Sequence, residues 1–168
     1  MPLFEELRCH WLDCNIFVEA KNGPYAFDIA PGFWNWLEGL SLNGTVRSSI
    51  HVYTELQNGS DQLSRWTRTL KKSSGLFVTP SRSVQKRCGE IAAFVQKHYG
   101  APQAASFLAG ADPWIVAHAL DDGGIVVTQE TRVPSTSRQV KIPNVCDEFR
   151  VEHLGAYDAF RKLGLRLG

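Results

Sequence analysis

Short apolar runs alternate with helix-like segments along almost the whole chain, and this alternation constrains the fold more than any other feature. Residues 125–128 form the clearest buried strand, because they are a β-branched run preceded by two glycines. Shorter apolar runs predict strands at residues 9–13, 45–50 and 76–78, one or two within 140–146, and an edge strand at 165–167. Strands that alternate with helices are typical of a parallel sheet covered by helices. We therefore expect an α/β fold with a mainly parallel sheet.

Apolar residues spaced by three and four positions predict the helices between these strands. We expect helices at residues 31–42, from residue 51, around 63–70, at 81–99, 113–122 and 153–163, with a small helix after residue 102. Ser48 or Ser49 can cap the helix from residue 51, and Asp112 can cap the helix that Pro113 opens. No repeat or linker divides the chain, so residues 1–168 are expected to form one domain.

Composition narrows the class of protein. The apolar fraction of 43% and charged fraction of 21% are ordinary for a globular domain, and a net charge of +1 gives no global basic field. The residues from Met1 to Cys9 lack the apolar core of a signal peptide, and no run is long enough to span a membrane. The four cysteines show no CxxC spacing, which indicates free thiols in a reducing compartment. We expect a cytoplasmic protein.

Four acidic residues stand at positions where a parallel sheet would gather them. Asp13 ends the first predicted strand, Glu130 follows the strand at 125–128, and Glu55 and Asp112 lie on helices that can face them. Ligands of open parallel sheets bind at the carboxyl ends of the strands. Carboxylate oxygens are the ligands that Mg²⁺ and Mn²⁺ prefer, and such ions support phosphodiester hydrolysis. The pattern therefore favours a metal-dependent nuclease.

Each acid also has an ordinary structural interpretation. Asp13 and Asp112 could serve only as helix caps, and a glutamate on a helix, such as Glu55, is most often a solvated surface residue. Glu130 repeats the position of Asp13 after a strand. The set is harder to explain structurally than its members, because two acids follow strands and two occupy helices that can face those strands.

Several segments resemble one protein family. LDCNIFVEAK (residues 12–21), PGFWNWL (31–37), ADPWIVAHA (111–119) and KIPNVC (141–146) look like an uncharacterised prokaryotic branch of the PIN-like nuclease superfamily, related to the VapC-type toxin ribonucleases. The resemblance runs from about Trp11 to Leu163. It implies a three-layer α/β/α sandwich with a central, mainly parallel sheet, RNA cleavage that depends on Mg²⁺ or Mn²⁺, and an antitoxin partner.

The resemblance also implies roles for residues. Asp13 matches the acid after the first strand, with Asn15 in the accompanying polar position; Glu55, Asp112 and Glu130 match the later acids, and Thr128 the hydroxyl residue before the last one. We assign Asp13 and Asp112 as the principal metal ligands. Glu55 would orient water or bind a second ion, and Glu130 would act through ordered water. The chain departs from the family at Cys14, where threonine or serine is usual, and at Glu130, where aspartate is commoner.

Substrate and partners follow from the same assignment. Single-stranded or looped RNA is the expected substrate, because its exposed bases allow selection. The cations that could hold its backbone are on a predicted helix and near strand ends: Arg65, Arg68, Lys71, Lys72, Lys21 and Lys141. A homodimer is an open alternative to a monomer, and no membrane is involved. The aromatic cluster Phe33, Trp34 and Trp36 is expected to belong mainly to the core, with Trp34, on the helix face opposite Trp36, as the member that could be exposed. His51 and His118 are expected to be hydrogen-bonded histidines without a metal-binding role.

Two other functions remain open on the sequence alone, and a third is disfavoured. A structure-specific DNA nuclease could use the same acids, although helical arches would be expected in a longer chain. A non-catalytic binding or regulatory module could keep the acids for its fold or for a regulator. A phosphoacceptor domain needs an adjacent acidic pair after the first strand, which Asp13-Cys14-Asn15 does not supply.

Overall fold

A computed structural model describes residues 8–168; residues 1–7, which include most of the stretch examined for a signal peptide, lie outside the described part. Its centre is one sheet in which every neighbouring pair of strands is parallel. The strand order is β3-β2-β1-β4-β5. The strands are β1 (His10–Leu12), β2 (Val46–Ser49), β3 (Phe77–Val78), β4 (Ile125–Val127) and β5 (Glu152–Leu154). The first strand in sequence is therefore the middle strand of the sheet.

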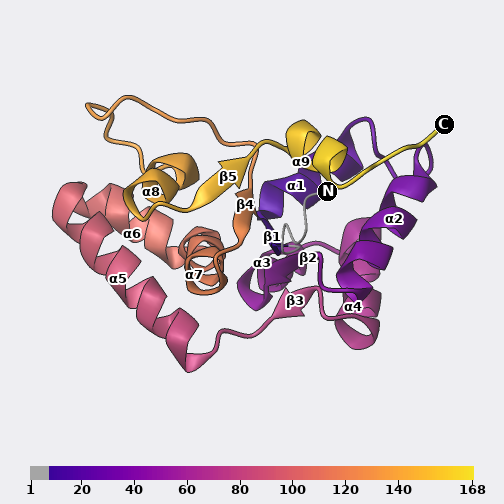
Figure 1. Ribbon diagram of the computed structural model, residues 1–168, viewed down its shortest axis with the longest axis horizontal. Helices are drawn as coiled ribbons and strands as arrows, with labels where there is room; N and C mark the ends of the chain where they lie inside the picture. Colours follow the sequence, from indigo (N-terminus) through magenta and orange to yellow (C-terminus); the bar gives the residue numbers. More distant parts are fainter. Residues whose placement is uncertain (1–7) are drawn as a thin grey trace, which may run out of the picture.

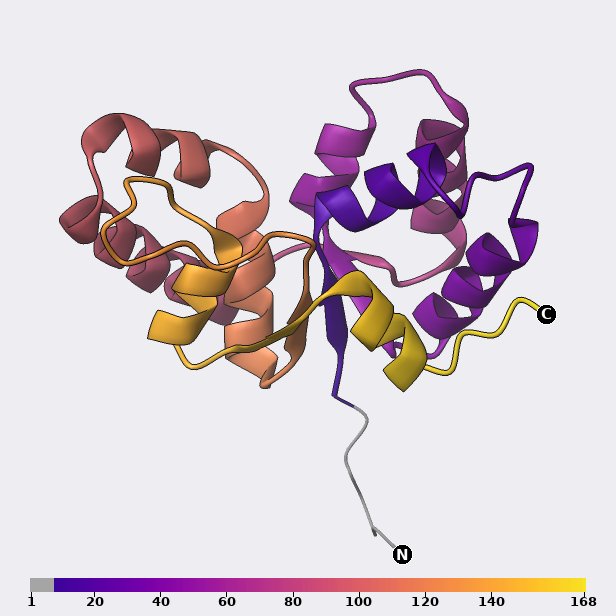
Figure 2. The ribbon, with the colours of Figure 1, turned by 90° about the horizontal axis from the view of Figure 1, so that it is seen from above.

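Helices cover both faces of the sheet. The helices are α1 (Cys14–Asn22), α2 (Pro31–Leu42), α3 (Ile50–Leu56), α4 (Gln62–Ser73), α5 (Arg82–His98), α6 (Ala101–Ala109), α7 (Asp112–Asp122), α8 (Ile142–Glu148) and α9 (Ala156–Lys162). Figures 1 and 2 show α1, α2, α4 and α9 on one side of the strands and α5, α6, α7 and α8 on the other. The expected three-layer α/β/α sandwich with a parallel sheet is confirmed.

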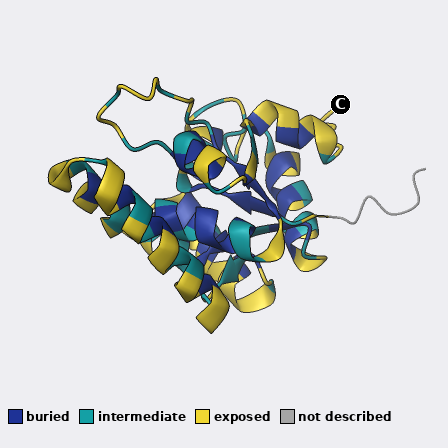
Figure 3. Ribbon diagram, turned by 60° about the vertical axis from the view of Figure 1, so that its left-hand side comes forward, coloured by how far each residue is buried: buried dark blue, intermediate teal, exposed yellow. Residues whose placement is uncertain are grey.

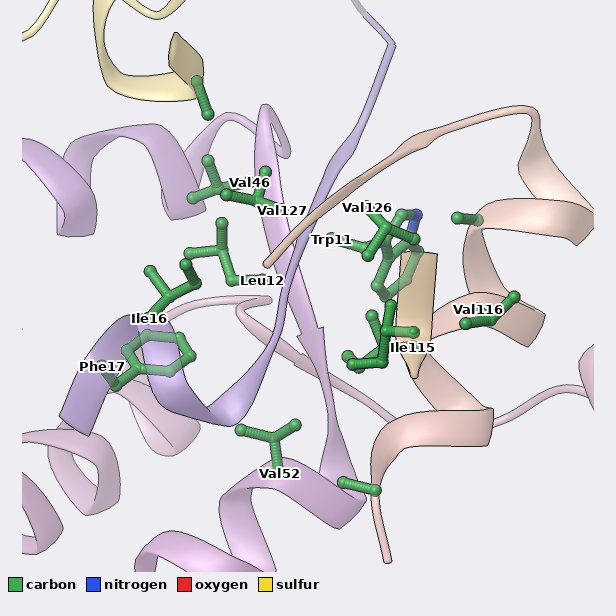
Figure 4. Close-up of a cluster of buried hydrophobic side chains, with 14 of the residues drawn as sticks. Trp11, Leu12, Ile16, Phe17, Val46, Val52, Ile115, Val116, Val126 and Val127 are labelled. Carbon is green, nitrogen blue, oxygen red and sulfur yellow. The ribbon is translucent and has the colours of Figure 1, made fainter. Parts of the chain in front are cut away.

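The core follows from strands that are apolar on both faces, as expected for a sheet buried between two layers. Leu12 faces Ile16 and Phe17 of α1, whereas its neighbour Trp11 faces the opposite helix layer, toward Ile115 of α7 (Figure 4). Successive side chains of a strand point to opposite faces, so β1 serves both halves of the core. Figure 3 shows the buried residues concentrated on the strands and on the helix faces that cover them.

Polar caps begin several helices where the sequence indicated. Ser49 accepts a hydrogen bond from the His51 amide at the start of α3, which confirms one of the two expected caps. Ser81 does the same for the Val84 amide of α5. Gly123 ends α7 with a φ of 71°, a conformation that favours glycine. These local signals fix where the chain leaves the sheet and returns to it.

The carboxyl-terminal third differs from the sequence-based expectation. Residues 140–146 were expected to hold one or two strands, but α8 starts at Ile142 with Pro143 in its first turn. Ile142, Val145 and Cys146 are buried at a spacing of three and four residues, so the short apolar run is one helical face. The strand is instead β5, and the expected helix at 153–163 starts only at Ala156.

Two further expectations were wrong. Residues 165–167 form no strand, since β5 already occupies the sheet edge beside β4. Trp34 is buried, with its ring stacked on Phe27 at 4.0 Å between centroids and its Nε1 donating to the Tyr25 carbonyl at 2.7 Å, whereas Trp36 is partly exposed. The turn that follows α1 folds back over α2 and supplies these partners, which helical spacing within α2 alone does not reveal.

The four cysteines, Cys9, Cys14, Cys88 and Cys146, are free thiols. Across residues 8–168, no helix combines the length and the apolar character needed to cross a membrane.

Candidate active site

Asp13 lies at the carboxyl end of the central strand, directly after β1. Its amide donates to the Val127 carbonyl of β4 at 3.0 Å, and the residue is 2% exposed. Although Asp13 occupies the N-cap position of α1, its carboxylate makes no capping hydrogen bond. It accepts a hydrogen bond from Thr128 Oγ1 at 3.1 Å instead. Capping alone does not explain why this carboxylate is buried and bonded to a hydroxyl beside the neighbouring strand.

Thr128 and Glu130 follow β4, the strand beside β1. The Thr128 hydroxyl donates to Asp13 and accepts from the Glu130 amide at 3.1 Å, so it links the two acidic segments. The Glu130 carboxylate accepts from the Ile142 amide at 2.8 Å, and Lys141 Nζ lies 4.0 Å from Glu130 Oε1. The start of α8 therefore holds Glu130 in place with one backbone donor and one nearby cation.

Glu55 and Asp112 approach from two helices. Glu55, on α3, accepts a hydrogen bond from the Ala111 amide at 2.9 Å, directly before α7. Asp112 is the first residue of α7 and not its cap: Ala111 holds the cap position, and no side chain caps the helix. Within residues 8–168 the Asp112 carboxylate makes no hydrogen bond and no ion pair, so the expected capping role was wrong. Pro113 in the first turn removes one amide that a capping carboxylate could bind.

The four acids share one electrostatic environment. Burial raises the pKa of Asp112 to about 7, and the carboxylates of Asp13, Glu130 and Glu55 contribute to the same shift, while Lys141 opposes it. Burial likewise raises the pKa of Asp13 to about 6; the Thr128 hydrogen bond opposes the increase, and Glu130 and Glu55 add to it. A carboxylate raises the pKa of another acid only when the two lie near each other, and Glu55 and Glu130 act in this way on both Asp13 and Asp112. The structure therefore brings all four predicted acids to one edge of the sheet.

Cys14 lies in the same environment, half-buried at the start of α1. Burial raises the pKa of its thiol, and the carboxylates of Glu55, Asp13 and Asp112 raise it further. The thiol is thus protonated at neutral pH and adds no charge to the acidic edge.

The donor set suits a hard cation held with few protein ligands. Within residues 8–168, no group of three or more His, Cys, Asp and Glu side chains is arranged so that it could hold a metal ion by itself. Mg²⁺ commonly keeps several waters and is bound through only one or two carboxylates. One oxygen of Glu55 and one of Glu130 already accept backbone amides, whereas Asp112 is uncommitted. Carboxylate oxygen is the preferred ligand of such ions, so the residues fit one.

The other predicted residues are distributed unevenly around this edge. Asn15 is exposed on α1, while Thr128 is buried at the centre of the acids. Lys21 forms an ion pair with Asp61 at 2.6 Å, and Asp61 caps α4. Of the predicted cations, Lys141 alone is among the groups that shift the pKa of Asp13 or Asp112.

The cations of α4 are exposed and have local contacts. Arg65 donates to the Ser60 carbonyl at 3.0 Å, and Lys71 Nζ lies 4.5 Å from the centroid of the Tyr53 ring. Arg68 and Lys72 are exposed on the same helix. Since none of these side chains contributes to the pKa shifts of Asp13 and Asp112, they lie outside the immediate electrostatic environment of the acids.

The structure adds a cleft that the sequence did not reveal. It has a volume of 340 Å³ and is lined by Thr128, Glu130, Arg132 and His153, among others. Arg132 binds Asp147 through two hydrogen bonds, from Nε at 2.5 Å and from Nη2 at 2.9 Å. A second cleft, of 360 Å³, begins at Asp112 and includes Lys141. The segments that line the two clefts are far apart in the sequence, so only the fold shows that they flank the acids.

His51 and His118, the two histidines expected to be hydrogen-bonded, differ from each other. His51 stacks on Trp114, with ring centroids 4.4 Å apart, and its Nδ1 lies 3.0 Å from Ser49 Oγ. His118 stacks on Trp11 at 4.3 Å, but its buried Nε2 has no hydrogen-bond partner within residues 8–168. The expectation of a hydrogen-bonded histidine therefore fails for Nε2 of His118. Burial lowers the pKa of His118 to about 4, so the ring is neutral at neutral pH.

Known proteins match this chain in fold and in one family profile. The similar solved structures include VapBC2 from Rickettsia felis, bound to a DNA fragment from its promoter, and VapBC-1 from nontypeable Haemophilus influenzae. The first is 20% identical with a TM-score of 0.51, covering 88% of this chain and 98% of that one. The second is 18% identical with a TM-score of 0.53, covering 88% and 97%.

No curated protein matches the chain in sequence. The profile described as "Domain of unknown function (DUF4411)" matches residues 10–167. That match contains every acid of the carboxyl edge and all five strands. The chain belongs to the DUF4411 family, and its fold is PIN-like and related to that of VapC.

Proposed function

We propose that this protein is a Mg²⁺- or Mn²⁺-dependent endoribonuclease and the toxin of a toxin–antitoxin pair. The observation that carries the proposal is the acidic edge: four carboxylates share one environment, two have raised pKa values, and Lys141 is the cation that opposes the shift of Asp112. Such an arrangement is unfavourable without a cation, because the carboxylates repel one another. The fold supports the proposal, since ligands of open parallel sheets bind at the carboxyl ends of the strands, and Asp13 directly follows β1.

Each acid has a part in the proposed reaction. Asp13 and Asp112 would hold the ion, and the Thr128 hydroxyl keeps Asp13 in one orientation through its 3.1 Å hydrogen bond. Glu55 and Glu130, each fixed by a backbone amide, would accept hydrogen bonds from waters around the ion through their remaining oxygen. When bound, the ion lowers the pKa of a water and offsets charge that develops on the phosphoryl oxygens. Lys141 would hold a neighbouring phosphate.

The decisive experiment is cleavage by purified protein. Single-stranded RNA, structured RNA and single-stranded DNA are each incubated with Mg²⁺, Mn²⁺ or a chelator. We expect RNA to be cut only with a metal, and Asp13→Asn and Asp112→Asn each to lower the rate by about 1,000-fold, equivalent to about 4 kcal/mol. Asp158→Asn, an equally conservative change at an exposed site on α9, is the control and should keep the wild-type rate.

The outcomes separate the alternatives. Cleavage of DNA in preference to RNA would show that the substrate is DNA and not RNA. RNA cleavage that survives in Asp13→Asn would place the chemistry elsewhere. A wild-type protein that binds Mn²⁺ and cuts neither nucleic acid would favour a non-catalytic binding module. One observation favours that module: residues 8–168 contain no ready group of three metal-holding side chains.

The toxin assignment has its own test. Induced expression of the chain alone should slow growth in the cytoplasm of a bacterial host, and Asp13→Asn should abolish the effect. Co-expression with the product of the adjacent gene should restore growth and give a stable complex, which size-exclusion chromatography with light scattering would detect and distinguish from a homodimer. Growth arrest by both the wild type and Asp13→Asn would contradict a toxin that acts through this site.

A further inference from the structure

The cleft that begins at Asp112 has the size and position of a nucleotide site. Its 360 Å³ lie between α6 and residues 139–141, with Asp112 at one end. Pockets for small ligands start at about 300 Å³. The cleft is continuous with the acidic edge because Asp112 belongs to both. A strand of RNA with one phosphate at the acids could therefore place an adjoining residue here.

The polar side chains of this cleft are not used by the fold. In the described part of the chain, Gln103 and Ser106 of α6 and Gln139 make no side-chain hydrogen bonds; the one bond of Gln139 is from its backbone amide. A side-chain amide offers both donors and an acceptor, which matches the mixed edge of a nucleobase. Phe107, which is 6% exposed, forms part of the cleft wall and gives it a small apolar area.

The cation of the cleft, Lys141, lies at the end of the cleft that is near the acids. Lys141 lines it and is 4.0 Å from Glu130, so its ammonium group stands between the cleft and the acidic edge. The 340 Å³ cleft on the other side of Glu130 is different: its Arg132 is committed to Asp147 by two hydrogen bonds. Lys141 is only loosely paired, and the side-chain amides of Gln103 and Gln139 make no hydrogen bonds within the described residues. We therefore favour the Asp112 cleft as the site that selects a base.

We propose that the Asp112 cleft holds one nucleotide of single-stranded RNA next to the phosphodiester that is cut, with Lys141 on its phosphate and Gln103 and Gln139 reading its base. The inference rests on the proposed ribonuclease function and adds to it a specificity site. Recognition of this kind makes cleavage depend on the base at one position beside the cut.

The test uses a single-stranded RNA with a randomised segment, whose cut sites are sequenced. The wild type should prefer one base, or one pair of bases, at a position beside the cut by about tenfold or more, as expected for paired hydrogen bonds to a base edge. Gln103→Ala combined with Gln139→Ala should reduce that preference to about twofold. Lys141→Gln should raise KM by about tenfold and change kcat less, since the cation acts in binding.

Matched controls come from the exposed face of α5, outside the cleft. Gln96→Ala and Lys97→Gln should leave the preference and KM unchanged. The double glutamine variant should also keep the Mn²⁺-induced rise in melting temperature, which shows that it is folded and binds metal.

Two results would overturn the inference and leave the proposed function standing. One is a wild-type protein that cuts RNA without any base preference beside the cut. The other is a preference that is the same in the wild type and in the double variant. A wild-type protein that cuts no RNA with either metal would instead overturn the proposed function, and this inference with it.

Discussion

The aspartates at the two edges of the sheet differ in how many hydrogen-bond and ion-pair partners they have. At the amino edge, Asp122 accepts hydrogen bonds from Trp11 Nε1 at 3.0 Å and the Gly124 amide at 2.8 Å. Asp121 accepts from Ser83 at 2.9 Å and lies 3.7 Å from Arg87. At the carboxyl edge, Asp112 has no such partner in residues 8–168, and Asp13 has one hydroxyl. The carboxylates at the amino edge have hydrogen-bond partners within the fold, whereas those at the carboxyl edge have few partners and repel one another.

The contrast separates acids that the fold pairs from acids that it leaves largely unpaired. Burial raises the pKa of Asp122, but hydrogen bonds from the Gly124 amide, Trp11 Nε1 and its own backbone amide lower it, and Asp121 is the one carboxylate among the causes. Asp112 has a raised pKa with three carboxylates among its causes. Groups that the fold could have paired but did not are typical of sites where function opposes stability. Burial alone does not distinguish the two edges, since it is the largest cause of the raised pKa of both Asp122 and Asp112.

The largest effect is expected at the satisfied edge. Trp11→Ala should lower the free energy of unfolding by about 3–5 kcal/mol, because it removes a buried ring, its stacking on His118 and the donor to Asp122. Chemical denaturation monitored by circular dichroism measures this. A loss below about 1 kcal/mol would show that the amino edge is not held by these contacts.

The next effect is metal binding at the unsatisfied edge. Mg²⁺ or Mn²⁺ at about 100 times its dissociation constant should stabilise the wild type by about 2.7 kcal/mol, a rise in melting temperature of roughly 5–10 °C. Asp13→Asn should lose the rise, whereas Asp122→Asn, the matched change at the other edge, should keep it. Equal responses of the wild type and Asp13→Asn, measured by differential scanning fluorimetry, would place the ion elsewhere.

A smaller effect is expected for Asp13→Asn without metal. Since the folded-state pKa of Asp13, about 6, exceeds the ordinary value of 3.8, the folded state binds the proton more tightly. Protonated Asp13 therefore stabilises the folded state; this stabilisation is fully present below pH 3.8 and is lost as pH rises through about 6. The asparagine side chain carries no charge, so the variant should be more stable than the wild type by about 1–3 kcal/mol at pH 8 and not at about pH 3.5.

The measurement is the difference in unfolding free energy between the two proteins at each pH. His118, with a pKa lowered from 6.5 to about 4, destabilises the fold as pH falls through this range, the opposite sign in an overlapping range. Taking the difference cancels this contribution, because His118 is present in both. A difference that stays constant between about pH 3.5 and pH 8 would contradict the raised pKa of Asp13.

The smallest effect is expected at an exposed ion pair of the amino edge. Arg8 and Glu152 pair there, with side chains 40% and 46% exposed. Glu152→Gln should cost less than about 1 kcal/mol, since solvent screens exposed pairs, and added salt should reduce even that. Urea denaturation at low and high salt measures both. A larger loss of unfolding free energy would mean that surface charge, and not only buried hydrogen bonds, stabilises the amino edge.

The sequence predicted the parts of the fold that depend on local patterns. The strands around Trp11 and Ile125 were found because they are continuous apolar runs, and the cap at Ser49 because a hydroxyl precedes an apolar stripe. β5 was missed because an edge strand with Glu152 and His153 is only partly buried and has no such run. α8 was mistaken for strand because seven residues are too few to show helical spacing clearly.

The candidate acids could be proposed from sequence because strand ends are visible in it. Asp13 and Glu130 follow apolar runs, and Glu55 and Asp112 were placed by helix position and by family resemblance. What the sequence could not show is how the acids are held. The amides of Ala111 and Ile142 that bind Glu55 and Glu130 come from segments 56 and 12 residues away. Such partners depend on tertiary folding, as do both clefts.

The position of β1 in the sheet determines when this edge is assembled during protein synthesis. A ribosome releases Asp13 early, but Thr128, whose hydroxyl binds it, follows 115 residues later. The amide of Ile142 that holds Glu130 lies a further 12 residues beyond that glutamate. Until β4 inserts beside β1, a nascent chain has Asp13 without its partners. On the proposed function, a growing chain cuts no RNA, its own messenger included, until Ile142 has been synthesised and the edge has assembled.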